Sequence, residues 1–211
     1  MLWVVISIWQ FHRTGGALCL DFANTMSWRR SASPIERLAS YADLASWAQQ
    51  AGLISKSEEA SLCAHATSDP QRSRRTMGRA HSLREAIFDT FAALSEGRIA
   101  LEEIASLEPS IQQAVVHSDL VRDVSRYRWE PMLVGDRMHR VLYAIACSAG
   151  DLLTSADISR IGQCSGPDCR WLWVDRTRNQ SRRWCDMRVC GNRVKARRHY
   201  QRARQAAGAP T

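Results

Sequence analysis

Several features that would quickly assign a chain to a class are missing from this sequence. Its 211 residues contain no apolar run that approaches the roughly 20 residues of a membrane-spanning helix. There is no internal repeat and no low-complexity linker, and the HExxH, GxSxG, P-loop and GxGxxG patterns are all absent. The six histidines are scattered along the chain. We therefore expect neither a membrane protein nor an enzyme.

Acidic residues are scarce in the last quarter of the chain. From Arg160 to Thr211 there are 13 Lys and Arg but only 3 Asp and Glu. The rest of the chain carries 16 basic and 18 acidic residues, so the whole net charge of +8 comes from this last quarter. Such asymmetry is typical of contact with nucleic acid or another anionic surface. Charge alone fits a solvated basic tail almost as well.

The first nine residues, MLWVVISIW, are apolar but lack the basic start and small-residue cleavage site of a signal peptide. A buried strand is the favoured interpretation of this stretch, and an over-long start is the alternative. With no secretory signal recognised, we expect the protein in the cytoplasm.

Hydrophobic periodicity predicts a mainly helical region before the basic quarter. Two glycines followed by alternating apolar residues over 18–22 predict a turn into a short extended segment. Capping boxes predict helices that begin at Ser33 and Ser55, the first of them ending at Gly52. The remaining predicted elements are a strand over 126–130 and helices over 70–96, 101–116 and 132–153, the last as the central core helix.

Four of the seven cysteines form two C-x4-C pairs within the basic quarter. In a chain without a secretory signal, this spacing favours a metal over disulfides, with reduced or redox-active thiols as the alternative. Four thiolates suit one Zn²⁺ and leave no coordination position open, so we expect a structural ion. The other three cysteines, Cys19, Cys63 and Cys147, lie in apolar surroundings and are expected to be small buried hydrophobes. The predicted zinc ligands are Cys164, Cys169, Cys185 and Cys190.

The residues between the two cysteine pairs predict a β-hairpin, with one strand at 171–175 and a returning strand at 182–184. A basic helix would follow from Gly191. A segment of about fifty residues with so few aliphatic side chains cannot build a self-sufficient core. A structural zinc supplies roughly 10–16 kcal/mol of apparent binding free energy instead.

The expected fold class is therefore mainly α, with two domains. A helical domain with a few short strands would cover residues 1–157. A small zinc-ribbon or treble-clef-like module, a hairpin followed by the basic helix, would cover residues 158–211.

Two sets of motifs resemble known families. CGNR at 190–193, preceded by RRWC and followed by KARRHYQRAR, resembles the CGNR zinc finger. Upstream, GGALCLDFANT, ERLASYADLASWAQQAGL, RAHSLREAIFDTFAAL and SAGDLLTSADISRI resemble the ABATE domain that accompanies this finger. The resemblance spans residues 11–204. It implies a bacterial transcription regulator linked to stress responses, whose four cysteines above are the zinc ligands.

The helix after Gly191 would carry a thin apolar stripe of Ala196, Tyr200, Ala203 and Ala207, which we expect to pack on the hairpin or on the larger domain. Basic side chains cover the rest of it, and a polyanion would relieve their repulsion. The residues predicted to contact nucleic acid are Arg182, Arg183, Arg193, Lys195, Arg197, Arg198, Arg202 and Arg204.

DNA is favoured over RNA because the module lacks aromatic residues arranged on a sheet for stacking bases. RNA, or an acidic partner protein, remains the alternative. Support of the metal site is a better explanation of Trp171, Trp173 and Trp184 than base stacking. Asn192 fits adenine recognition and local capping equally well.

The helical domain is expected to sense a small molecule or stress signal, or to form a homodimer. Asp21 and Asn24, beside two glycines, are the best candidates for a pocket there. Capping and turn hydrogen bonds explain these two residues more simply.

Overall fold

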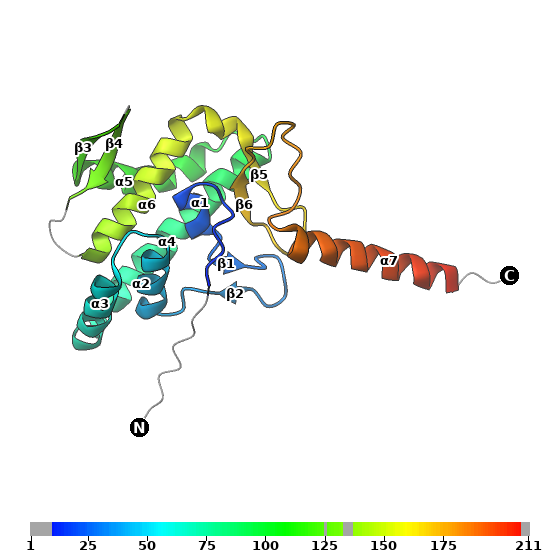
Figure 1. Cartoon of the computed structure of the whole chain (residues 1–211), viewed down its shortest axis with the longest axis horizontal. Coiled ribbons are helices and arrows are strands. Elements are labelled where there is room, and N and C mark those ends of the chain that lie inside the picture. The colour runs from blue at the N-terminus through cyan, green and yellow to red at the C-terminus, as the bar shows by residue number, and fades with distance from the viewer. Residues whose placement is uncertain (1–9, 125, 133–136, 208–211) are drawn as a thin grey trace, which may run out of the picture.

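The computed structural model describes residues 10–124, 126–132 and 137–207, and the strand expected over residues 1–9 lies outside this part. The chain is mainly helical, as expected, with short antiparallel hairpins (Figure 1). The elements, in chain order, are α1 (Leu18–Ala23), β1 (Met26–Ser27), β2 (Ile35–Glu36), α2 (Tyr41–Gln50), α3 (Lys56–Ser68), α4 (Pro70–Ser95), α5 (Leu101–Val116), β3 (Ser118–Asp123), β4 (Arg126–Pro131), α6 (Arg137–Thr154), η1 (Ala156–Arg160), β5 (Ile161–Gln163), β6 (Leu172–Val174), η2 (Met187–Gly191) and α7 (Asn192–Ala207).

The main core lies where α1 packs against the long helices α4 and α6. Phe22 of α1, Phe91 of α4 and Ile145 of α6 are completely buried in it. Burying a side chain of this kind stabilises the fold by roughly 1.5–3 kcal/mol. Among the described helices, none is both long and apolar enough to span a bilayer.

Most of the predicted helices are confirmed. Ser55 and Glu58 form the expected capping box of α3. The side chain of Asp69 accepts a hydrogen bond from the first turn of α4, whose first residue is proline. Helix α6, predicted from residue 132, is observed from Arg137.

The extended segment predicted over residues 18–22 is wrong, because this stretch is helix α1. The apolar alternation misled the prediction because the short helix is enclosed on nearly all sides. Cys19, Leu20, Phe22 and Ala23 are all completely buried, so no exposed face gives a helical period.

The predicted start of the helix at Ser33 is also wrong, although its end before Gly52 is confirmed. Helix α2 begins after Ser40, which forms a capping box with Asp43. Glu36 lies instead in β2, which pairs with β1, and its carboxylate binds the guanidinium of Arg84 on α4 at 2.6 Å.

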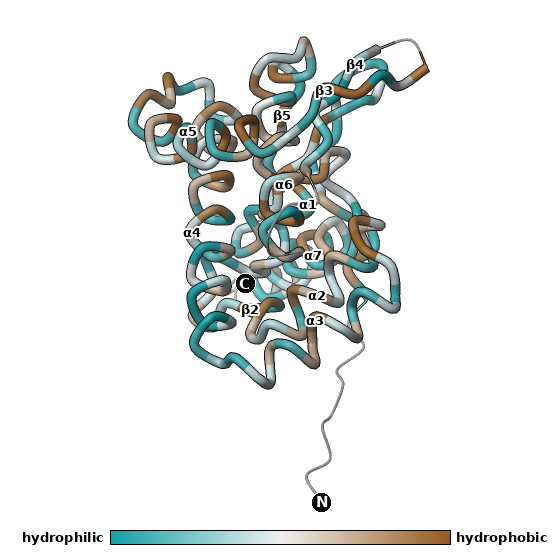
Figure 2. The backbone as a smooth tube through the Cα atoms, turned by 90° about the vertical axis from the view of Figure 1, so that its left-hand side faces the viewer, coloured by the Kyte–Doolittle hydropathy of each residue, from teal (hydrophilic) through white to brown (hydrophobic). Residues whose placement is uncertain are grey.

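The strand predicted over residues 126–130 is confirmed as β4, and its antiparallel partner is β3. This hairpin places Leu120 opposite Trp129, and both side chains are exposed. Figure 2 shows the hairpin at the edge of the molecule, away from α2 and α3.

The strand of the C-terminal hairpin is confirmed as β6, but its predicted partner is wrong. Strand β6 pairs with β5, before the first cysteine, while residues 182–184 form an irregular return. Leu172 and Val174 of β6 are buried within the main core, because this strand packs against α1 and α4. The hairpin therefore attaches the C-terminal part of the chain to the helical part.

Candidate metal centre and basic helix

Four cysteine sulfurs come together next to the C-terminal hairpin. Those of Cys169 and Cys185 lie 3.6 Å apart, and those of Cys185 and Cys190 lie 3.4 Å apart. The four Sγ atoms, including that of Cys164, all lie within 4.8 Å of one another and are buried. All seven cysteines fall within the described residues, and none forms a disulfide.

Short turns bring the sulfurs together. A Cβ at Gly166 would lie 3.3 Å from the Cβ of Cys169 and 3.4 Å from the sulfurs of Cys164 and Cys190, so this turn packs closely against the cluster. In the second pair, the carboxylate of Asp186 accepts hydrogen bonds from the backbone N–H groups of Arg188 and Val189. This cap starts η2, which carries Cys190 directly into α7.

The electrostatics of the cluster favour a cation. Hydrogen bonds from the thiols of Cys169 and Cys185 lower the pKa of the Cys164 thiol. Donating those bonds raises the pKa of Cys169 and of Cys185, and burial raises the pKa of Cys190. Ionising one thiol therefore makes the others harder to ionise. A dication at the centre removes this conflict by stabilising all four thiolates.

The geometry fits one structural zinc ion. At the usual Zn–S distance of about 2.3 Å, a tetrahedral site needs sulfurs about 3.8 Å apart, close to the 3.6 Å between Cys169 and Cys185 and the 3.4 Å between Cys185 and Cys190. The backbone N–H groups of Gly166 and Cys185 each donate to the Cys164 sulfur at 3.4 Å, as expected for a thiolate ligand. Zinc, when bound, supplies folding free energy and crosslinks the two turns.

Helix α7 leaves the body of the protein directly after the cluster and projects away from it (Figure 1). It carries six basic and no acidic residues. The apolar stripe expected to pack inward does not do so, because Ala196, Tyr200 and Ala203 are exposed, Tyr200 by 63%. The side chain of Ala207 lies outside the described part. The predicted packing is wrong because the helix extends beyond any surface that could cover it.

Comparison with known families agrees with both parts of the structure. The profile of the ABATE family, described as "Putative stress-induced transcription regulator", matches residues 16–156, more than half of the chain. The chain belongs to this family. The CGNR zinc finger matches residues 160–203. No curated protein matches the chain. Neither family description is that of an enzyme.

The ABATE region, residues 16–156, holds the CGNR finger, residues 160–203, through polar contacts that the sequence did not reveal. The side chain of Asn24 donates to the carbonyl of Leu172 and accepts from its N–H, both at 2.8 Å, as a neighbouring strand would. Just before the ABATE region, the carbonyl of Gly15 accepts a hydrogen bond from the N–H of Val174 at 2.8 Å.

Asp21 holds the turn that makes the Gly15 contact. Its carboxylate accepts from the N–H of Gly15 at 2.8 Å, and burial raises the pKa of this carboxyl. A Cβ at Gly15 would lie 2.8 Å from the backbone nitrogen of Asp21, which explains the glycine. The turn hydrogen bonds therefore account for Asp21, and the pairing with Leu172 accounts for Asn24.

The tryptophans of the CGNR finger lie around the cysteine cluster. Trp171 and Trp173 are buried with the four cysteines, and Trp184 packs against them. The indole N–H of Trp171 donates to the carbonyl of Met26 in the ABATE region at 3.0 Å. This placement supports the interpretation that these tryptophans support the metal site.

The eight basic residues predicted to contact nucleic acid differ in their surroundings. Arg182 donates to the carbonyl of Cys185 at 2.7 Å and lies over the Trp173 ring, so its guanidinium is engaged within the finger. Arg193, at the base of α7, lies 4.0 Å over the ring of Trp28. Seven of the eight are exposed: Arg183, Arg193, Lys195, Arg197, Arg198, Arg202 and Arg204.

Proposed function

We propose that this chain is a zinc-containing bacterial transcription regulator that acts in the cytoplasm and binds DNA through the CGNR finger and α7. The observation that carries the proposal is the exposure of α7, which presents basic side chains well away from the body. Without acidic neighbours on the helix, this charge has no compensation within α7, and DNA phosphates would provide it.

The basic side chains of α7 form two rows. At about 100° per residue, Arg193, Arg197 and Arg204 fall within about 40° of one another. Lys195, Arg198 and Arg202 form a second row on the opposite side of the helix, within about 60°. The exposed stripe of Ala196, Tyr200 and Ala203 lies between these rows.

This arrangement suits the major groove of B-form DNA. The groove admits an α-helix, and a phosphate backbone lies along each of its sides. The two basic rows would face the two backbones, and the apolar stripe would face the groove floor, where thymine methyl groups accept apolar contacts. The major groove of A-form RNA is too deep and narrow for side chains to read, so the same arrangement favours DNA.

The base of α7 is fixed at two points, which favours a rigid reading helix over a mobile tail. Cys190 links the start of α7 to the metal cluster, and Arg193 contacts Trp28 of the ABATE region. Arginine suits such a helix because its planar fork binds phosphate or guanine with two hydrogen bonds.

Binding of the zinc-loaded protein to a 20-base-pair DNA duplex, measured by fluorescence anisotropy, tests the proposal. If about six phosphates are contacted, affinity falls roughly a thousandfold between 50 and 200 mM salt. Arg197→Glu together with Arg202→Glu removes one contact from each row. This double variant is expected to weaken binding about 50-fold at 0.1 M salt and to reduce the salt slope by about 2.

The matched control is Arg74→Glu together with Arg75→Glu. Both are exposed arginines near the start of α4, and this double variant has the same change in net charge. Equal loss of affinity in the two double variants would contradict a specific role for α7. Equal competition by A-form RNA would contradict the major-groove arrangement. Equal competition by poly-glutamate would instead favour an acidic protein partner.

A further inference from the structure

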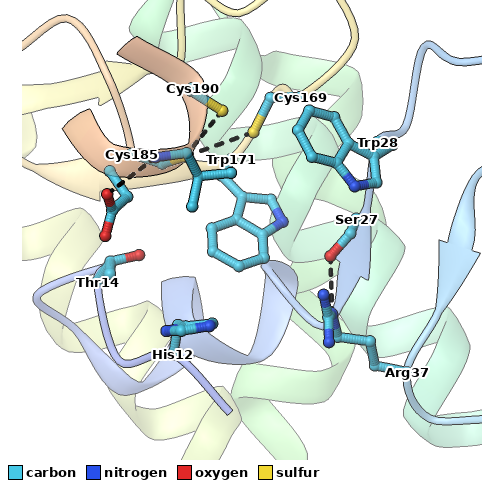
Figure 3. Close-up of a pocket in the computed structure, with 11 residues that line it drawn as sticks. His12, Thr14, Ser27, Trp28, Arg37, Cys169, Trp171, Cys185 and Cys190 are labelled. Carbon is cyan, nitrogen blue, oxygen red and sulfur yellow. Dashed lines mark hydrogen bonds between the residues drawn. The ribbon is translucent and has the colours of Figure 1, made fainter. Parts of the chain in front are cut away.

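The largest well-defined hollow near the metal centre is too small for most metabolites. It measures about 130 Å³ and lies beside the cysteines, where Trp28 and Trp171 line it (Figure 3). A cavity of about 150 Å³ is the size that accommodates benzene alone. By contrast, a groove of about 490 Å³ lies between α4, α5 and α6 in the ABATE region. This volume falls within the range of ligand-binding pockets, about 300–1,000 Å³.

One stripe of residues from each of the three helices lines this groove. The lining residues recur at helical spacing on α4 from Arg75 to Ala86 and on α6 from His139 to Ala146. Small side chains are frequent in these stripes, so the helices leave the space between them open. The small lining residues on α4 and α5 are Gly78, Ser82, Ala86, Ser106 and Ser110.

Gly78 is a glycine that the fold itself does not require. It lies inside α4, where glycine destabilises a helix relative to alanine. A Cβ at this position would meet no described atom within 4 Å, so packing within this part of the chain does not exclude a side chain. A ligand that packs against the backbone of α4 would account for the missing side chain.

Positive charge gathers at one end of the groove. Arg75 and Arg79 lie about one turn apart on α4, and Nη1 of Arg79 lies 3.0 Å from Nε2 of His139 on α6. Among the described residues, no carboxylate pairs with either arginine, and none lines the groove. Guanidinium and imidazole can both carry positive charge, so their contact favours an anion beside them.

The other end of the groove offers neutral hydrogen-bonding groups. Helices α4 and α5 are joined by only five residues, so they run antiparallel. Ser106 and Ser110 of α5 therefore lie toward the end of α4 that is away from Arg75. In the described part of the chain, the hydroxyls of Ser110 and Tyr143 and the side-chain amide of Gln113 form no hydrogen bond, although all three residues line the groove.

We infer that this groove binds a sugar phosphate, with the phosphate at the arginine end and the sugar hydroxyls at the serine end. Two guanidinium groups suit a phosphate dianion, because each can donate two charge-assisted hydrogen bonds to it. Serine and glutamine side chains both donate and accept hydrogen bonds, as sugar hydroxyls do. The buried side chains of Leu83 and Leu142 also line the groove and provide apolar contact for the sugar ring. This site is independent of DNA binding.

Calorimetric titration of the full-length, zinc-loaded protein with ribose 5-phosphate and with glucose 6-phosphate, in about 0.15 M salt, tests the inference. Saturable one-to-one binding of at least one of them is expected. The parent sugar and inorganic phosphate are each expected to bind at least about tenfold more weakly, because each reaches only one end of the groove. Absence of saturable binding of both sugar phosphates, or equal affinity for inorganic phosphate, would overturn the inference.

Two variants test the position of the site. Arg79→Gln removes a charge at the arginine end and is expected to weaken binding at least about tenfold. The matched control is Arg74→Gln, an exposed arginine of the same helix that does not line the groove, and it should leave the affinity unchanged. Gly78→Leu fills the groove and should abolish binding, while its better helix propensity keeps the midpoint of urea unfolding unchanged or raises it. Full affinity in either groove variant would overturn the inference.

The 20-base-pair duplex distinguishes this site from DNA binding. Saturating duplex should leave the affinity for the sugar phosphate unchanged, since no residue of α7 lines the groove. Displacement of the sugar phosphate by the duplex would assign the groove to the DNA backbone and overturn the inference. Because the other titrations contain no DNA, failure of the proposed function leaves their results unaffected.

Discussion

The ABATE region and the CGNR finger are stabilised by different forces. In the ABATE region, α1, α4 and α6 bury aliphatic and phenylalanine side chains against one another. In the finger, the buried cluster consists of four cysteines and two tryptophans, with two more tryptophans packed against it. The metal ion therefore supplies in the finger the stabilisation that apolar burial supplies in the ABATE region.

The two regions are nevertheless joined through a shared strand. Leu172 and Val174 lie in the finger by sequence but are buried in the core of the ABATE region. We propose that the boundary between residues 157 and 158 separates two sequence domains, while packing continues across it.

Removal of one zinc ligand should have the largest effect. We expect Cys185→Ser to abolish stoichiometric zinc and to unfold the finger, since structural zinc contributes on the order of 10 kcal/mol or more. Elemental analysis and NMR of the finger amides measure this. The control is Cys63→Ser on α3, which should keep full zinc content; equal zinc in both variants would contradict the tetrathiolate site.

Removal of an aromatic ring from the ABATE core should lower stability only through the loss of apolar burial. Phe91 is completely buried, so Phe91→Ala is expected to lower the free energy of unfolding by about 4 kcal/mol. Urea denaturation of the zinc-loaded protein measures the loss. The variant should still bind one zinc per chain when folded. Loss of zinc from the folded variant would show that apolar burial in the ABATE region and metal binding in the finger depend on each other.

A substitution at the contact between the ABATE region and the CGNR finger should destabilise both regions. Asn24→Ala leaves the N–H and carbonyl of Leu172 without their partner, which costs about 3 kcal/mol. Hydrogen exchange should show the strongest loss of protection at β5 and β6. Asn179→Ala, on an exposed loop, is the matched control. Unchanged stability of the Asn24 variant would mean that its hydrogen bonds do not hold the finger in place.

The smallest loss of stability is expected when the ion pair between Glu36 and Arg84 is removed. Burial tends to raise the pKa of the Glu36 carboxyl, but hydrogen bonds from Arg84 outweigh it, and the pKa lies below its ordinary value. The pair therefore stabilises the fold above the unfolded pKa of about 4.3, and the contribution is lost as pH falls through the folded pKa.

We expect Glu36→Gln to lower the free energy of unfolding by about 2 kcal/mol at pH 7. The difference between variant and wild type should shrink as pH falls below about 4.3. Parallel urea denaturation series at several pH values measure this, and a difference that does not change with pH would contradict the ion pair.

The sequence was informative where local chemistry determines the structure. The cysteine spacing and the capping box of Ser55 and Glu58 depend on neighbouring residues, and both appear in the structure. The helical state of residues 18–23 and the pairing of Asn24 with Leu172 depend on packing across the whole chain. The exposure of α7 could not be predicted from its apolar stripe, because periodicity does not show whether a covering surface is present.

The central claim is that metal, rather than apolar burial, stabilises the cysteine turns of the finger, while β6 attaches the finger to the ABATE core. Hydrogen exchange of the wild-type protein, before and after zinc removal by a chelator, tests it most directly. The account predicts fast exchange throughout residues 164–191 outside β6 after zinc removal, with amides of β6, α4 and α6 still protected. Protection that persists over residues 164–191 outside β6 without zinc would contradict it.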